Sequence, residues 1–442
     1  MQDKFHYLLK NFNLFYQTDN SQISYTTTAA PSLVNIQPLV PKDFFNEQAD
    51  IDPNKVIWKT WKGVNIPFLF AANDLQEIMT IVDDRVVINY DIVGAVFYFL
   101  SGWNELQNPQ RDQFGRVAFK DSMIKHLSIA TIPVVNYYFD ILHDAIQRAS
   151  GNSRKRKVWQ GRDFGMALSH DIDVCRTGWM EGAMSELKKG KLGSIPKIIW
   201  QRLTDKDIWF NFREISTLVR HYGGTSSFYF LCQKGKAGQM KNADYDVEDK
   251  KIQREIDYLK KEGHEVGVHG SFGTHQDVKA LRRDMSKLGS RPVIGNRFHF
   301  LMFDPKETVA NLAENGIKYD TTLGFADRIS FRRGTCYPFY LYDFLNDRCS
   351  EVLELPLLVM DQTLKNSKYM GIDQEAAYQQ IVGIIDEVRK FNGLFSLLWH
   401  NNFFSEYKYT GWKAVCEKTL AYCQQNNGFI SSGKEIYESI IN

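Results

Sequence analysis

The chain has 442 residues, of which 43% are hydrophobic and 24% are charged, as in an ordinary soluble globular protein. Its length suits two or three domains rather than one small one. The formal net charge of +2 provides no general attraction to nucleic acid or to an anionic membrane, which excludes binding driven by overall charge.

The start of the chain predicts no targeting segment. Residues 1–17 lack the basic start, the continuous apolar stretch and the small-residue cleavage site of a secretion signal. The most apolar later stretch, residues 92–100, is about half the length needed to cross a bilayer. We therefore expect a soluble, cytoplasmic protein with no membrane span and no nucleic-acid partner.

Residues 1–150 contain no recognisable catalytic constellation and are expected to form a small α/β or α+β accessory domain. Within them, residues 58–70 and 85–90 look like strands, and residues 92–103 and 126–146 look helical. The composition then shifts to small polar and basic residues, beginning at Ser150, which is typical of an exposed linker. We place this basic linker at residues 151–160.

From Phe164 onward, strand-like segments alternate with helical patterns, which predicts parallel strands joined by right-handed crossovers. One helix is expected around residues 252–259 and another over residues 377–388, the latter with Asp373 as its N-cap. Residues 178–201 contain several glycines and a proline, and an insertion or mobile loop is expected there.

Seven strands are expected in this second part of the chain. They predict a distorted, seven-stranded (β/α) barrel over residues 161–442, with a doubly wound open sheet as the alternative α/β arrangement. The strands end near His170, Leu231, His269, His299, Asp320, Pro356 and Trp399.

Polar side chains follow the ends of these strands. Because the carboxyl ends of parallel strands face one mouth, residues far apart in sequence should converge there. Asp171 and Asp173 are two residues apart on an extended chain, so both carboxylates can point into the same pocket. The other residues of the set are His269, Arg297, His299, Asp320 and His400.

This set of residue types indicates metal-assisted hydrolysis. One carboxylate and two imidazoles would leave an open position for water on a Zn²⁺-like ion. The ion lowers the pKa of that water, a second carboxylate removes its proton, and a further histidine protonates the leaving group.

The segments resemble the polysaccharide deacetylase family, also called carbohydrate esterase family 4, over about residues 160–430. Ser169-His-Asp-Ile-Asp173 is similar to a divergent Asp-x-Asp variant of that family's first motif, usually Thr-Phe-Asp-Asp-Gly. The resemblance implies that Asp171 is the catalytic base and Asp173 a metal ligand. It also implies a distorted (β/α) barrel, here with an extra N-terminal domain.

The later motifs resemble the family in the same order. His269, in Val-Gly-Val-His-Gly-Ser, resembles the first metal-binding histidine, and Arg297 resembles the arginine that holds the base. Asp320, in Tyr-Asp-Thr-Thr-Leu-Gly, is similar to the fourth motif, and His400, in Leu-Leu-Trp-His, resembles the final motif that supplies the general acid. We expect Asp320 to orient His400.

One departure concerns the third metal ligand. The family's second histidine should follow His269 by four residues, but position 273 is glycine. His299, at a strand end, and His275, on an irregular loop, are the two substitutes. We favour His299 because metal sites need ligands held by a rigid scaffold. A degraded, non-catalytic site is the third possibility.

The leading hypothesis is a divalent-metal-dependent deacetylase that removes N-acetyl groups from a sugar of a polysaccharide, oligosaccharide or glycan precursor. The expected metal is zinc, with cobalt, manganese or nickel as alternatives. The alternative functions are hydrolysis of another C–N bond in a small molecule, or non-catalytic glycan binding. A carbohydrate is the expected partner.

Overall fold

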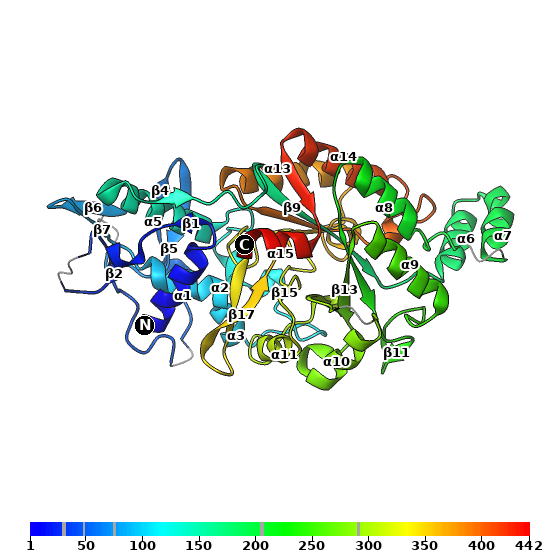
Figure 1. The fold of residues 1–442 in the computed structure, drawn as a ribbon, viewed down its shortest axis with the longest axis horizontal. Helices are drawn as coiled ribbons and strands as arrows, with labels where there is room; N and C mark the ends of the chain where they lie inside the picture. The colour runs from blue at the N-terminus through cyan, green and yellow to red at the C-terminus, as the bar shows by residue number, and fades with distance from the viewer. Residues whose placement is uncertain (29–31, 47–48, 74–76, 204–206, 290–291) are drawn as a thin grey trace.

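The computed structural model describes residues 1–28, 32–46, 49–73, 77–203, 207–289 and 292–442. A curled, open sheet forms the centre of the molecule, and helices cover its outer side (Figure 1). Within the described residues the sheet has ten strands, in the order β16-β17-β15-β14-β13-β10-β9-β19-β18, with β20 also paired to β9. The strands are β9 (Phe164–Ile172), β10 (Ser227–Leu231), β13 (Glu265–Gly270), β14 (Gly295–Phe298), β15 (Tyr319–Asp320), β16 (Phe339–Asp343), β17 (Arg348–Glu354), β18 (Val359–Met360), β19 (Leu394–Leu398) and β20 (Gly428–Ser431).

All seven expected strands are present, but the sheet contains three more. β16 pairs antiparallel with β17, and β18 and β20 pair parallel with β19 and β9. β18 is only two residues long, too short for a periodic pattern to reveal. The sheet ends at β16 on one side and β18 on the other, so the curled sheet is a half-barrel rather than a closed barrel.

The helices that cover the sheet follow the expected amphipathic patterns. Ile252, Ile256 and Leu259 are buried on α9, and the Asp373 side chain accepts a hydrogen bond from Ala376 N at the start of α13, 2.9 Å away. The helices of this part are α6 (Gly178–Lys188), α7 (Ile195–Leu203), α8 (Phe212–His221), α9 (Lys250–Lys261), α10 (Val278–Ser286), α11 (Thr308–Glu314), α12 (Asp361–Lys365), α13 (Gln374–Lys390), α14 (Trp412–Gln425) and α15 (Gly433–Ile441).

Residues 178–201, expected to be an insertion or a mobile loop, form the helices α6 and α7, which project from one end of the molecule (Figure 1). The segment is therefore helical rather than a loop. The glycines here permit close packing. A Cβ atom at Gly178 would lie 2.3 Å from Asp207 Oδ1, and one at Gly182 would lie 2.8 Å from Ile208 Cδ1.

The N-terminal part has a small sheet of its own and lies at the opposite end of the molecule from α6 and α7 (Figure 1). The expected strand over residues 58–70 is a hairpin that turns at Lys62 and Gly63, both at positive φ. The elements are α1 (Gln2–Phe12), β1 (Tyr16–Gln17), β2 (Ile23–Tyr25), β3 (Val34–Ile36), β4 (Ile57–Trp61), β5 (Val64–Phe68), β6 (Met79–Val82), β7 (Arg85–Ile88), α2 (Ile92–Ser101), α3 (Trp103–Gln107), α4 (Met123–His126) and α5 (Val134–Ser150).

The N-terminal part and the half-barrel share one continuous hydrophobic core. Tyr7 donates a hydrogen bond to Tyr340 O at 2.6 Å, and the buried Glu105 binds Arg332 at 2.7 Å. The basic segment expected to be an exposed linker is anchored, because residues 154–155 form strand β8 on β1 and Trp159 is buried. The polar composition of this segment therefore does not make it a free linker, because the pairing with β1 and the buried Trp159 attach it to the rest of the chain.

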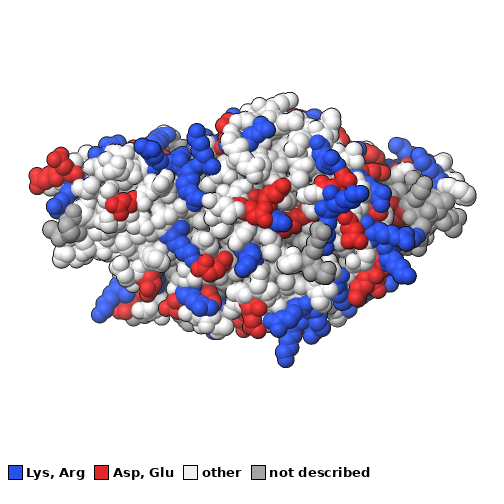
Figure 2. Space-filling model, viewed as in Figure 1, with Lys and Arg blue, Asp and Glu red and all other residues white. Residues whose placement is uncertain are grey.

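None of the described helices is long and apolar enough to cross a membrane. Acidic and basic side chains are interspersed over the face shown in Figure 2.

Candidate metal centre and active site

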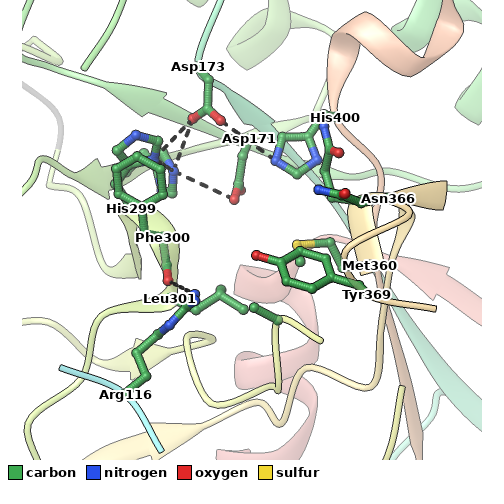
Figure 3. A pocket seen from close by; sticks show the side chains of 13 residues that line it. Arg116, Asp171, Asp173, His299, Phe300, Leu301, Met360, Asn366, Tyr369 and His400 are labelled. Atoms are coloured by element: carbon green, nitrogen blue, oxygen red, sulfur yellow. Dashed lines mark hydrogen bonds and ion pairs between the residues drawn. The ribbon is translucent and has the colours of Figure 1, made fainter. Parts of the chain in front are cut away.

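Four parallel strands bring the candidate site together at their carboxyl ends. Asp171 is the second-last residue of β9, His269 lies in β13, and His299 follows β14. His400 follows β19, which pairs with β9. Their side chains line a cavity of about 210 Å³, with His299 on one side and His400 on the other (Figure 3).

Asp173, His269 and His299 have the spacing of a metal site. Their ligand atoms lie 3.2 Å apart for His269 Nε2 and Asp173 Oδ1, 3.4 Å for His299 Nδ1 and Asp173 Oδ1, and 3.2 Å between the two imidazole nitrogens. Ligands about 2.0–2.1 Å from a tetrahedral zinc ion lie about 3.3–3.4 Å from each other. The three ligand atoms therefore fit a zinc-sized ion.

Hydrogen bonds on the far side of each imidazole direct these ligand atoms inward. His269 Nδ1 contacts Arg297 O at 2.8 Å, and His299 Nε2 contacts Lys241 O at 3.0 Å. A ring nitrogen that donates to a carbonyl leaves the other nitrogen as the metal ligand. Burial lowers the pKa of His299 to about 4, which favours the neutral form that binds metal.

Asp173 Oδ1 supplies a second indication that these residues suit a metal ion. This buried oxygen accepts no hydrogen bond from any described residue. A buried polar atom without a partner costs free energy, and buried carboxylates are normally paired or coordinated to metal. The residues present therefore fit a divalent cation.

His275, the alternative third ligand, lies outside this group. The only group of three or more candidate ligands found among the described residues is Asp173, His269 and His299. Gly273 adopts φ +85° at the start of the turn that carries His275, whose ring packs 6.1 Å from that of Phe298. The geometry thus favours His299 over His275.

Asp171 is bound on one side by a buried arginine. Arg297 Nη1 donates to Asp171 Oδ1 at 2.8 Å and to Ser169 Oγ at 2.9 Å, while Arg297 Nε donates to Thr321 O at 2.9 Å. Asp171 and Arg297 are 2% and 1% exposed. Because one carboxylate oxygen is held by Arg297, the other is left to face the cavity beside His269 Nε2, 3.6 Å away.

The carboxylate that contacts His400 is Asp361, and not Asp320 as expected. Asp361 accepts from His400 Nδ1 at 2.7 Å and from His400 N at 2.5 Å. Burial lowers the pKa of His400, but the Asp361 carboxylate outweighs burial, so the pKa is raised to about 9. His400 Nε2 lies 3.7 Å from Asp173 Oδ2, on the cavity side.

Asp320 is buried beside the site and holds neighbouring strand ends together through hydrogen bonds. It accepts hydrogen bonds from Asn296 Nδ2 at 2.6 Å and Thr322 Oγ1 at 2.9 Å, and it does not line the cavity. The sequence did contain a signal for Asp361, since an apolar run at residues 357–360 ends directly in this carboxylate.

The turn that carries His299 is strained and is held from outside the half-barrel. Phe300 and Leu301 have φ of +59° and +54°, a conformation that costs energy for residues with a side chain. Arg116, from the N-terminal part, donates to Phe300 O (Figure 3). It also binds Asp112 through Nη2 at 2.7 Å. Phe114 stacks on Phe300 with ring centroids 4.6 Å apart.

Comparison with protein families found one match, to a family of unknown function named DUF7033, over residues 3–150. No curated protein matches the chain.

Comparison with solved structures found similarity in about two thirds of the chain. A protein from Mycobacterium smegmatis assigned as a polysaccharide deacetylase is 14% identical with a TM-score of 0.43, and the match covers 64% of this chain and 91% of that one. PuuE allantoinase is 10% identical with a TM-score of 0.43 and the same coverage of both chains. A protein from Pseudomonas aeruginosa PAO1, also assigned as a polysaccharide deacetylase, is 10% identical with a TM-score of 0.42, covering 63% and 91%.

Proposed function

We propose that this chain is a metal-dependent hydrolase that removes the acetyl group from the nitrogen of an N-acetylated sugar. The observation that carries the proposal is the arrangement around one cavity of three groups: the three candidate ligands, the Asp171 and Arg297 pair, and the His400 and Asp361 pair. The motif resemblance of Asp171, Asp173 and His269 supports the same assignment.

Asp173, His269 and His299 would hold the ion, which when bound would polarise the amide carbonyl and lower the pKa of a water molecule. Asp171 takes the proton of the attacking water through the oxygen that Arg297 does not bind. Arg297 keeps this carboxylate oriented toward the cavity, because its guanidinium is itself fixed by Ser169 and Thr321.

His400 supplies the second proton. With its pKa raised to about 9, it is protonated at neutral pH and can donate from Nε2 to the departing amine nitrogen. Asp361 fixes the ring through Nδ1 and stabilises the imidazolium. The water oxygen and its second proton end on the acetyl group, which leaves as acetic acid, while the first water proton reaches Asp171 and the amine leaves with the proton from His400.

Acetate release from N-acetylated chitooligosaccharides by zinc-loaded protein tests the proposal. Asp171→Asn should abolish release, because an amide cannot accept the proton. Asp373→Asn is the matched control, since asparagine caps a helix as well as aspartate and α13 should be unchanged. Release that survives Asp171→Asn would refute the assignment of the base. No bound ion and no rescue by Zn²⁺ or Co²⁺ would favour a non-catalytic glycan-binding protein.

A further inference from the structure

Residues 178–200, which comprise α6 and most of α7, form a helical hairpin at one end of the molecule (Figure 1). Of the twelve exposed large hydrophobic residues in the described part of the chain, six lie in this hairpin. These six are Met180, Met184, Leu187, Leu192, Ile199 and Trp200, and their exposed fractions range from 42% to 66%. Apolar side chains gathered on a surface in this way mark a site of interaction.

Helix α6 turns its apolar side outward. Its buried residues are Gly178, Gly182 and Glu186, which repeat at i, i+4 and i+8 and face the protein. The exposed row consists of Met180, Met184 and Leu187, at i, i+4 and i+7. At about 100° per residue, the two rows lie on nearly opposite sides of the helix. A surface helix ordinarily buries its apolar stripe, so the outward row is available to a partner.

The hairpin is held in this orientation by contacts with segments beside the catalytic cavity. Thr177, which precedes α6, donates to Asp244 through its backbone N at 2.8 Å and through Oγ1 at 2.7 Å. Ser185 Oγ donates to Tyr407 O at 2.9 Å. Because α6 begins five residues after Asp173, the hairpin leaves the sheet on the side of the cavity mouth.

The charge of the hairpin is positive. It contains four lysines and two glutamates. Lysines bind both glutamates, because Lys408 lies 2.8 Å from Glu181 and Lys189 lies 3.4 Å from Glu186. The three remaining lysines are exposed: Lys188, Lys191 and Lys197. Each of the three lies within two residues of an exposed apolar side chain, so positive charge borders the apolar surface.

We propose that the hairpin docks on the surface of a membrane that contains anionic lipids. Its apolar side chains would enter the boundary between headgroups and acyl chains, and its lysines would meet the negative headgroups. A two-fold contact between two copies of the chain would instead bring the same lysines against each other. The charge therefore favours lipid over a second copy. This inference concerns binding alone and does not depend on the proposed function.

Sedimentation with vesicles tests the proposal on the whole chain. One set of vesicles is phosphatidylcholine alone, and the other contains about 30% phosphatidylglycerol, which supplies the negative charge. The protein should bind the anionic vesicles at least tenfold more tightly than the neutral ones. Raising the NaCl concentration to about 0.5 M should weaken this binding, because salt screens the attraction between lysines and headgroups.

Two sets of substitutions separate the apolar and the electrostatic contributions. Replacing Met184 and Leu187 together by serine should weaken binding at least tenfold without changing the charge. The matched control replaces Ile81 and Val82 by serine, since these residues are 59% and 55% exposed but lie in β6, in the N-terminal part. If the serine variant of α6 does not fold, Leu192→Ser makes the same test from between the two helices, where Leu192 is 61% exposed.

The second set removes charge. Each lysine near an anionic surface strengthens binding about fivefold, so replacing all three exposed lysines of the hairpin by glutamine should weaken it about a hundredfold. The control replaces three other exposed lysines by glutamine: Lys279, Lys306 and Lys318. This control should bind close to wild type.

The outcomes either support or overturn the proposal. Loss of vesicle binding in both hairpin sets, with near-normal binding in both controls, supports it. No binding to anionic vesicles, undiminished binding in either hairpin set, or an equal loss in the controls would overturn it. Light scattering during size-exclusion chromatography measures self-association. A dimer that the serine variant of α6 breaks apart, in a protein that ignores vesicles, would assign the apolar surface to a second copy and overturn the membrane proposal.

Discussion

Removing the imidazole of His299 should disable metal binding, whereas removing that of His275 should not. His299 Nδ1 lies 3.4 Å from Asp173 Oδ1 and 3.2 Å from His269 Nε2, while His275 is outside the group of ligand atoms. Structural zinc sites with four protein ligands bind with about 10–16 kcal/mol, or about 3 kcal/mol per ligand. His299→Ala should therefore raise the zinc Kd by more than about a hundredfold.

Competition with a chromophoric chelator at neutral pH measures the zinc Kd of the wild type and of both alanine variants. His275→Ala should bind zinc close to wild type, and it is a matched control because both histidines are buried, at 6% and 7% exposed. A large loss of affinity in His275→Ala, combined with normal affinity in His299→Ala, would refute the ligand assignment. Equal loss in both would show that the turn near residue 275 moves when metal binds.

Three further predictions concern the surroundings of the site and the fold. Asp361→Asn removes the charge that raises the pKa of His400 to about 9; if the pKa returns to 6.5, the protonated fraction at pH 8 falls about thirtyfold. A pH–rate profile should show this loss of kcat at pH 8 and much less at pH 6, and an unchanged profile would contradict the role of Asp361. Arg116→Ala frees the strained turn and should weaken zinc binding by about tenfold, with Lys120→Ala as the control. Burial lowers the pKa of His264 from 6.5 to about 4, so the unfolded chain binds a proton first as the pH falls. His264 should therefore cost the protein about 2 kcal/mol of stability between pH 7 and pH 5, measured by urea unfolding against His264→Gln, and parallel curves would contradict it.

The strand ends could be predicted from sequence because catalytic side chains follow apolar runs. His269 and His400 have this signal directly, and Asp171 follows the apolar run by three residues; parallel strands must place such residues at one edge of the sheet. Arg297 follows Gly295 and Asn296 rather than an apolar run, and it was predicted from its place at a strand end and from the motif resemblance. In the structure it donates to Asp171 Oδ1 at 2.8 Å.

The remaining features depend on contacts between distant parts of the chain. The direction in which His299 points is set by the turn at Phe300 and Leu301. Both residues have positive φ angles, which cannot be predicted from the presence of phenylalanine and leucine. Asp361 reaches His400 because β18, two residues long, pairs beside β19.

The sequence alone predicted seven of the ten described strands of the half-barrel sheet, because burial and periodicity act locally along the chain. It also predicted five residues that line the cavity: Asp171, Asp173, His269, His299 and His400. Only the tertiary structure placed His299, and not His275, beside Asp173 and His269, and placed Asp361 beside His400. Each of these depends on side chains brought together by packing, and the Arg116 contact with Phe300 joins positions 184 residues apart.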